Sequence, residues 1–188
     1  MTLGKIKKIM PEVKSRMSYS RIHLSRELRV KVAEEILNIM TSRHKHFGLF
    51  VIAGWQDKWN IYTDISDSRQ DIFGKHNINI MEGTSSQDEI ATTVDFDGAI
   101  LVDNNGDIKH SGVIIEGLRP SMVAKKVNPG EFDDLSEQFG FTGKVHSRHL
   151  SAISASYIFK NTTVYTVSEE NDSFHIYEAG RILYEWDK

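Results

Sequence analysis

Residues 47–53, with the sequence FGLFVIA, form a run in which every position is apolar or glycine. A continuous run of this kind, rich in aromatic and β-branched residues, is typical of a strand buried inside a sheet. A buried strand requires a sizeable core around it. The 188 residues of the chain are enough for one domain with such a core and too few for two comfortable ones.

The segments around this run predict a mixed sheet with helices packed on it. Residues 20–40 place apolar side chains at steps of four and three, which predicts one α-helix with a single apolar stripe. The turn-forming residues Asn104, Asn105 and Gly106 separate two apolar runs and predict a hairpin. Further strands are predicted at residues 58–63, 77–81, 98–102, 108–115, 162–167, 174–177 and 181–186, and further helices at residues 87–93, 132–139 and 147–159. The predicted fold class is α/β, in one domain.

The positive charge is concentrated near the start of the chain. Residues 5–31 contain nine Lys or Arg and only two Glu, although the whole chain has a net charge of -3. We therefore divide the chain into a basic N-terminal helical arm, residues 1–19, and a domain of residues 20–188. Such an arm can bind nucleic acid, anionic lipid or an acidic partner, or it can be a solvated helix face. Only Tyr19 interleaves the cations, so no nucleic acid is expected.

Composition excludes several classes of protein. The chain has no cysteine, which excludes a disulfide scaffold, a thiolate zinc site and a cysteine nucleophile. The histidine pairs His44/His46 and His146/His149 match no closed zinc spacing.

No window has the roughly 18 apolar residues of a membrane span, and no secretory signal is present. We therefore expect a soluble, cytoplasmic protein. Residues 117–143 are expected to be a long connection of functional or mobile character.

Three short segments contain residues that suit chemistry. The first is Asp95-Phe96-Asp97-Gly98-Ala99, where two carboxylates lead into a predicted strand; they suit a hard cation, or they form a plain turn. The second is Ser147-Arg148-His149 at the start of a predicted helix. The free N–H groups of a first turn, with a hydroxyl, a guanidinium and an imidazole, suit a phosphate. The alternative is an N-cap serine with two solvated cations.

The third segment, Ser168-Glu169-Glu170, follows a predicted strand. Carboxylates at a strand end can bind a metal or orient a base, although they are more often turn surface.

In this order, the three segments resemble the motifs of the diadenylate cyclase domain, the nucleotide-binding domain first named from the DNA integrity scanning protein. That family carries Asp-Gly-Ala, then Gly-Thr-Arg-His-Arg, and in many members Val-Ser-Glu-Glu. Asp97-Gly98-Ala99 matches the first motif, and residues 167–170 match the third. Residues 146–150 match the second in part, because His146, Ser147 and Leu150 replace its Gly, Thr and second Arg. The resemblance spans roughly residues 30–186.

The resemblance implies an enzyme that condenses two ATP molecules into cyclic di-AMP and releases two pyrophosphates. It implies a divalent cation, Mg²⁺ or Mn²⁺, and a face-to-face homodimer or higher homo-oligomer, since each subunit binds one ATP. Asp97 is then the catalytic residue, and the metal ligands are Asp97, Glu169 and Glu170. The residues expected to bind the substrate are Gly98, Ala99, Ile114, Ser147, Arg148, His149, Ser151 and Ser168.

Two other functions remain open. A sensor domain of the same fold would bind ATP or a cyclic dinucleotide without turnover, which the loss of a cation at Leu150 favours. An unrelated α/β interaction module would use the basic arm to bind nucleic acid, and its affinity would then depend strongly on salt.

Overall fold

A mixed sheet crosses the whole molecule in the computed structural model, which describes residues 3–43, 45–65, 67–76, 78–82, 85–94 and 96–187. Its strands are β1 (Leu49–Trp55), β2 (Thr63–Asp64), β3 (Ile78–Asn79), β4 (Ala99–Asp103), β5 (Asp107–Ile115), β6 (Thr163–Val167), β7 (Phe174–Glu178) and β8 (Arg181–Trp186). The α-helices are α1 (Leu3–Ser18), α2 (Arg26–Ser42), α3 (Ser85–Thr92), α4 (Pro120–Val127), α5 (Leu135–Phe139) and α6 (Ser147–Ile158), and the 3-10 helices are η1 (Asp57–Tyr62) and η2 (Phe73–Lys75). The predicted α/β class is confirmed.

The strand order is β2-β5-β4-β1-β6-β7-β8, with β3 also paired to β5. Only β1 and β4 pair in parallel among the described strands, and every other pair is antiparallel. The hairpin β4–β5 forms where it was predicted. Gly106 has a φ of 93° in its turn, and Asp103 Oδ1 accepts hydrogen bonds from the N–H groups of Asn105 and Asp107.

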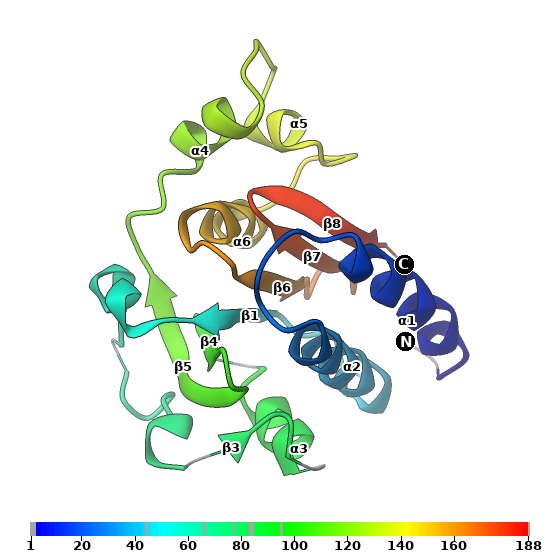
Figure 1. The fold of residues 1–188 in the computed structure, drawn as a ribbon, viewed down its shortest axis with the longest axis vertical. Coiled ribbons are helices and arrows are strands. Elements are labelled where there is room, and N and C mark those ends of the chain that lie inside the picture. The colour runs from blue at the N-terminus through cyan, green and yellow to red at the C-terminus, as the bar shows by residue number, and fades with distance from the viewer. Residues whose placement is uncertain are drawn as a thin grey trace.

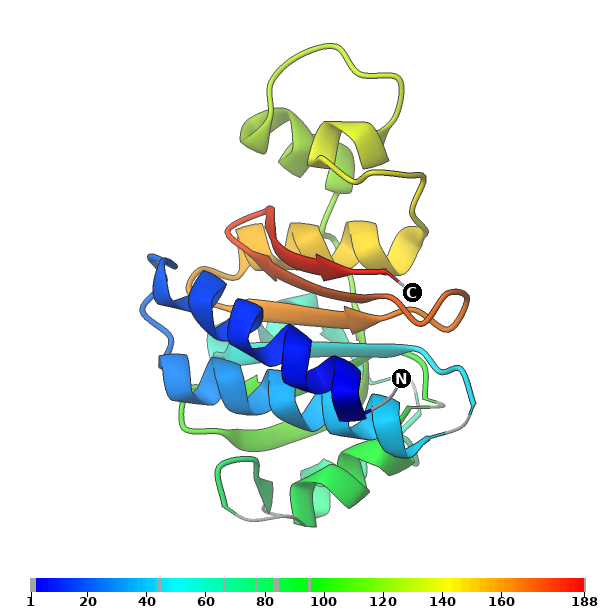
Figure 2. The same cartoon turned by 90° about the vertical axis from the view of Figure 1, so that its right-hand side faces the viewer.

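Helices cover both faces of this sheet. Figures 1 and 2 show α1 and α2 on one side of the strands, and α6 on the other with α4 and α5 beyond it. Side chains of β1 divide between the two faces: Leu49 and Val51 belong to the core with α1 and α2, while Phe50 and Ile52 belong to the core with α4 and α6. All seven residues of β1 are buried, as the apolar run predicted.

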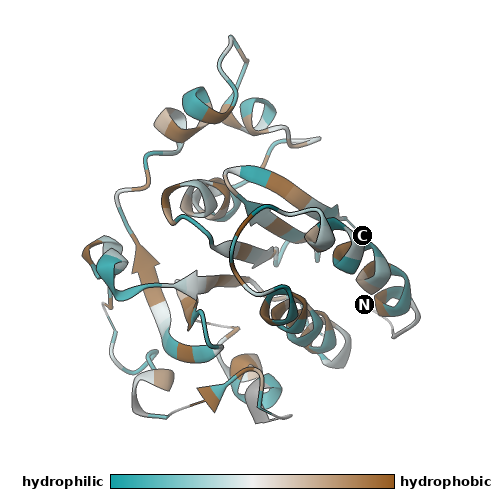
Figure 3. Cartoon of the chain, viewed as in Figure 1, coloured by the Kyte–Doolittle hydropathy of each residue, from teal (hydrophilic) through white to brown (hydrophobic). Residues whose placement is uncertain are grey.

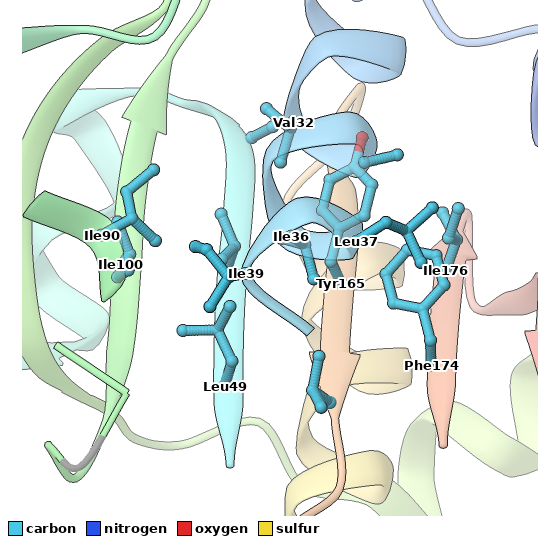
Figure 4. Close-up of a cluster of buried hydrophobic side chains, with 14 of the residues drawn as sticks. Val32, Ile36, Leu37, Ile39, Leu49, Ile90, Ile100, Tyr165, Phe174 and Ile176 are labelled. Carbon is cyan, nitrogen blue, oxygen red and sulfur yellow. The ribbon is translucent and has the colours of Figure 1, made fainter. Parts of the chain in front are cut away.

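The helix α2 contributes more buried side chains to the first core than any other element in the described part of the chain. Hydrophobic and hydrophilic residues alternate along its turns (Figure 3), and its side chains Val32, Ile36 and Ile39 are each at most 1% exposed. They lie against β1, β4 and β6 (Figure 4). The helix begins at Arg26 because the Ser25 hydroxyl caps it by accepting a hydrogen bond from the N–H of Leu28.

The basic first residues form helix α1, which packs on α2 and runs past β8. Its side chains Ile9, Met10, Val13 and Met17 are buried in the same core as α2. Residues 3–18 of the predicted arm therefore form a packed helix with a charged outer face. No helix in the described part of the chain is long and apolar enough to cross a membrane.

Residues 58–63 do not form the predicted strand; most of them belong to η1. A 3-10 helix places every third residue on one face, so Trp59 and Tyr62 both contact Phe159 while Ile61 is 85% exposed. The side chain of Trp55 donates a hydrogen bond to Asn60 Oδ1 and fixes the turn. The alternation of apolar residues in this segment is compatible with a strand and with a 3-10 helix. Local hydrogen bonds, such as the one from Trp55, decide between the two.

The connection between β5 and α6 contains two helices where one was predicted. Pro120 occupies the first turn of α4, where a missing N–H costs nothing. The amide side chains of Asn128 and Gln138 each donate a hydrogen bond to the other residue's carbonyl oxygen, at 3.1 and 3.0 Å, and so join α4 to α5. The predicted helix at residues 87–93 is α3, and the predicted strand at residues 77–81 is reduced to β3, with Asn77 outside the described residues.

Candidate functional site

The three sequence motifs meet at one end of the sheet. Leu49 of β1 pairs with Val167 of β6, and Val51 pairs with Ile100 of β4. Continued beyond the strand ends, these registers bring Gly48 between Ser168 on one side and Asp97 on the other. Neighbouring strands lie about 4.8 Å apart, so the Asp-Gly-Ala and Ser-Glu-Glu segments are separated by roughly two strand spacings.

Gly98 is held tightly at the start of β4. Its φ is 94°, and a Cβ placed there would lie 2.6 Å from the carbonyl oxygen of Val113. Only glycine fits both conditions. The predicted binding residues Ala99 and Ile114 have other surroundings: Ala99 is fully buried opposite Val113, and Ile114 is half-buried and pairs with Asp64 of β2. Asp97 itself is exposed, and the preceding Asp95 lies outside the described residues.

The start of α6 presents Arg148 to the same end of the sheet. A Cβ at position 48 would lie 2.3 Å from Nη1 of Arg148, so the guanidinium packs directly on the bare Cα of Gly48. Arg148 is half-buried there and has no hydrogen bond or ion pair within the described residues. The first intrahelical bonds come from His149 and Leu150 N–H to the His146 carbonyl. The N–H groups of Ser147 and Arg148 have no acceptor among the residues that the structure describes.

The start of α6 and the turn after β6 line a pocket of about 180 Å³. Six of the predicted site residues surround it together with His146: Ser147, Arg148, His149, Ser168, Glu169 and Glu170. A second pocket of about 140 Å³ adjoins it and shares His146, His149, Ser168 and Glu170. Asp97, Gly98, Ala99, Ile114 and Ser151 line neither pocket.

The carboxylate side of the pocket is a turn after β6. Ser168 is buried, its N–H donates to the Ser173 carbonyl, and its Oγ accepts from the N–H of Glu170 at 3.3 Å. Glu170 lies 2.8 Å from His146 Nε2, and both side chains are exposed. Glu169 is exposed as well.

His149 is buried, and its Nδ1 is turned toward strands β6 and β7. Its Nδ1 lies 2.7 Å from the Tyr177 hydroxyl and 3.2 Å from Thr166 Oγ1, and its ring lies 4.7 Å from that of His175. Burial first, and the charge of a protonated His175 second, lower the pKa of His149 to about 4. At neutral pH this imidazole is therefore uncharged, so Arg148 is the cation of the pocket wall at the helix start.

The carboxylates at this end have the hard oxygen chemistry that suits Mg²⁺ or Mn²⁺. Within the described ranges, however, no three His, Asp or Glu side chains form a group that could hold a metal ion. Asp97 is on the far side of Gly48 from Glu169 and Glu170. Any cation here would need ligands from the bound molecule. Of the histidine pair His44/His46, His44 lies outside the described residues.

Several residues of the site carry no sequence signal. Gly48 belongs to the site because the guanidinium of Arg148 packs on its Cα. Thr166, His175 and Tyr177 lie on strands, and the alternating pattern of those strands identifies them only as sheet positions.

Comparison with known proteins gives distant structural likenesses. No family model matches the chain, and no curated protein matches it. The crystal structure of a hypothetical membrane spanning protein from Bacillus cereus superposes with a TM-score of 0.49 and 13% identity, over 87% of this chain and 69% of that one. The crystal structure of a double mutant of DacA from Staphylococcus aureus superposes with a TM-score of 0.41 and 11% identity, over 95% of this chain and 87% of that one.

Proposed function

We propose that the chain binds a nucleoside triphosphate at the start of α6, and that two copies face to face condense two ATP molecules into cyclic di-AMP. The observation that supports this most directly is the guanidinium of Arg148, held on Gly48 without a partner among the described residues. A half-buried cation beside two free helix N–H groups is suited to an anion with several oxygens, such as a polyphosphate.

The reaction would need the residues in distinct roles. Each 3′-hydroxyl attacks the α-phosphorus of the other nucleotide, an O–P bond forms, and pyrophosphate leaves. Arg148 and the first-turn N–H groups would hold the triphosphate and stabilise the departing charge. Asp97 would hold the attacking hydroxyl in line. A divalent cation bound through Asp97, Glu169 or Glu170 would supply charge neutralisation.

A sensor without turnover is the second candidate, and two observations favour it. Leu150 stands where the resembled motif has a second Arg, and it packs against the core around α6. His149 is neutral at physiological pH. The pocket wall therefore offers one permanent positive charge, which suffices for binding more readily than for stabilising a leaving pyrophosphate.

Incubation of the protein with ATP and Mn²⁺ or Mg²⁺, followed by chromatography, separates the two candidates. The cyclase proposal expects cyclic di-AMP and pyrophosphate, at a rate that rises more steeply than linearly with protein concentration because two copies must meet. ATP binding by calorimetry without product, at high protein concentration, would favour the sensor. Absence of both would refute nucleotide binding.

Two variants divide the roles further. Arg148→Ala is expected to weaken ATP binding by about 1.5–3 kcal/mol, because a charged hydrogen bond is lost. Asp97→Asn is expected to preserve binding and to lower the rate about 10²- to 10³-fold. Arg69→Ala is the matched control, since Arg69 is an exposed arginine paired with Asp67 and away from the pocket. Equal ATP affinity in Arg148→Ala and the wild type would remove the helix start from the phosphate site.

A further inference from the structure

His149, Tyr177 and Thr166 form a closed triangle of polar atoms beneath the pocket. The Tyr177 hydroxyl lies 2.7 Å from His149 Nδ1, and Thr166 Oγ1 lies 3.2 Å from Nδ1 and 3.3 Å from the Tyr177 oxygen. Thr166 and Tyr177 are fully buried, and His149 is 5% exposed. Water therefore has little access to the triangle, and its hydrogen atoms must be shared among these three side chains.

Every hydroxyl hydrogen in the triangle finds an acceptor only when His149 Nδ1 accepts one, and the shorter of the two contacts to Nδ1, the one from Tyr177, favours the following arrangement. The Tyr177 hydroxyl donates to His149 Nδ1, and the Thr166 hydroxyl donates to the Tyr177 oxygen. In the reverse arrangement, with Nδ1–H donating to Tyr177 and Tyr177 donating to Thr166, the Thr166 hydrogen has no acceptor among the described residues. A buried unpaired donor is costly, so the first arrangement is favoured.

The other ring nitrogen of His149, Nε2, keeps some contact with solvent. Within the described residues Nε2 has no hydrogen-bond partner, yet it is not one of the buried polar atoms sealed from solvent. His149 also lines both pockets. An accepting Nδ1 on a neutral ring requires the proton to be on Nε2.

We propose that Tyr177 and Thr166 are positioning residues that fix His149 as its Nε2–H tautomer, so that the pocket receives an uncharged N–H donor for an oxygen of the bound nucleotide. This assignment rests on the proposed function only for the identity of the ligand. It goes beyond that function because it gives His149 the role of a neutral donor and names the two residues that set it.

The surroundings of His149 support an uncharged ring. Cations approach it on its own helix, where Arg148 and His146 flank it, and His175 faces it from β7. The acidic groups in reach are Glu170 after β6, Glu185 on β8 and Asp187 beyond it, which line the adjoining pocket. Desolvation outweighs these carboxylates and keeps the pKa of His149 low.

Nuclear magnetic resonance of the full chain, with ¹⁵N-labelled histidine, tests the tautomer directly at neutral pH. The His149 signals are assigned by their loss in His149→Gln. We expect a protonated Nε2 and an unprotonated Nδ1 in the wild type. The Tyr177→Phe/Thr166→Val double variant removes both hydroxyls, and its His149 is expected to become a mixture of tautomers.

The matched control is Tyr165→Phe. Tyr165 is also a fully buried tyrosine, and its hydroxyl donates to the Arg29 carbonyl at 2.8 Å on the opposite face of the sheet. This variant loses a comparable hydrogen bond without touching His149, so the tautomer is expected to stay unchanged. A wild-type His149 protonated on Nδ1, or an unchanged Nε2–H tautomer in the double variant, would overturn the inference.

Calorimetry with a non-hydrolysable ATP analogue measures the consequence for binding. The double variant is expected to bind about two- to tenfold more weakly, as for the loss of one neutral hydrogen bond, while Tyr165→Phe binds like the wild type. His149→Gln, whose amide can reach the Nε2 position, is expected to bind more tightly than His149→Leu. Equal affinity of the double variant and wild type would contradict the donor role. No binding of the analogue by the wild type would refute the proposed function and leave the tautomer measurement to judge the positioning role.

Discussion

At the scale of single residues, Gly48 and Gly98 are neighbours in the site that tolerate a side chain very differently. At Gly48 the three atoms nearest to an added Cβ all belong to the end of one flexible side chain, the guanidinium of Arg148, with Nη1 at 2.3 Å. At Gly98 an added Cβ meets the backbone of Val113 at 2.6 Å, with a φ of 94°. The first clash can be relieved by moving Arg148, whereas the second requires the sheet to shift.

Gly48→Ala is therefore expected to leave the free energy of unfolding nearly unchanged and to displace the Arg148 guanidinium. ATP affinity should then fall by about as much as in Arg148→Ala, about 1.5–3 kcal/mol, and the two changes combined should cost little more than either alone. Chemical denaturation and calorimetry on the three variants measure both quantities. Additive losses of affinity would show that Gly48 acts independently of Arg148.

Gly98→Ala is the contrasting variant. It is expected to lower the free energy of unfolding by at least about 1–3 kcal/mol, because it combines an unfavourable φ with a backbone clash. Gly143→Ala serves as the control, since no atom lies within 4 Å of its added Cβ. A Gly98→Ala variant with the same free energy of unfolding as the wild type would mean that the backbone at the start of β4 can move enough to accept a side chain.

At the scale of elements, a buried ion pair joins the helical layer to the sheet. Arg29 of α2 contacts Glu178 of β7 at 2.9 Å, and both side chains are at most 6% exposed. Ser20 and Thr163 donate hydrogen bonds to the same carboxylate. Arg29 also donates to the Met17 carbonyl at the end of α1, so one side chain connects three elements.

Arg29→Met is expected to destabilise the fold by about 3–5 kcal/mol, because it leaves the Glu178 charge buried without its cation. Arg29→Met/Glu178→Gln removes both charges and is expected to be less destabilised than the single variant. Lys14→Met, which removes an exposed pair with Glu34, should cost about 0–1 kcal/mol. Denaturant unfolding of the four proteins measures the differences. A single variant as stable as the double would contradict the burial argument.

At the scale of the whole molecule, two buried histidines make the fold sensitive to acid. Burial lowers the pKa of both His149 and His175 from 6.5 to about 4. Between these values the unfolded chain binds protons that the folded chain does not, so the free energy of unfolding decreases as pH falls from about 6.5 and levels off below about 4. Each histidine can contribute up to about 3 kcal/mol of this loss.

The expected slope is measured by urea unfolding at several pH values between about 7 and about 4. His175→Gln removes one titrating group and should flatten the curve in this window. Tyr165→Phe is the control, because it removes a buried hydroxyl whose raised pKa keeps it uncharged throughout this window, and its curve should run parallel to that of the wild type. Parallel curves for His175→Gln and wild type would show that His175 has the same pKa in the folded and unfolded states.

Much of the architecture follows from local pattern. The apolar run of β1, the stripe of α2 and the Asn-Asn-Gly turn between β4 and β5 each specify an element through burial, periodicity or backbone conformation within a few residues. The three motifs lie at one end of the sheet. That placement depends on the strand order β4-β1-β6, which local pattern does not specify.

What the sequence could not determine is the direction of each side chain at that end. The rotation of α6 about its axis decides that Arg148 crosses Gly48 while the adjacent His149 turns toward Tyr177, 28 residues away along the chain. The 3-10 helix after β1 and the helix α4 likewise depend on contacts made after collapse, with Phe159 and with α6. The sequence by itself determined the helices and strands that carry the motifs, since periodicity and turn chemistry act locally. Only the tertiary structure decided which group is a cation, which is a neutral donor and which is buried, because charge state and orientation depend on long-range packing.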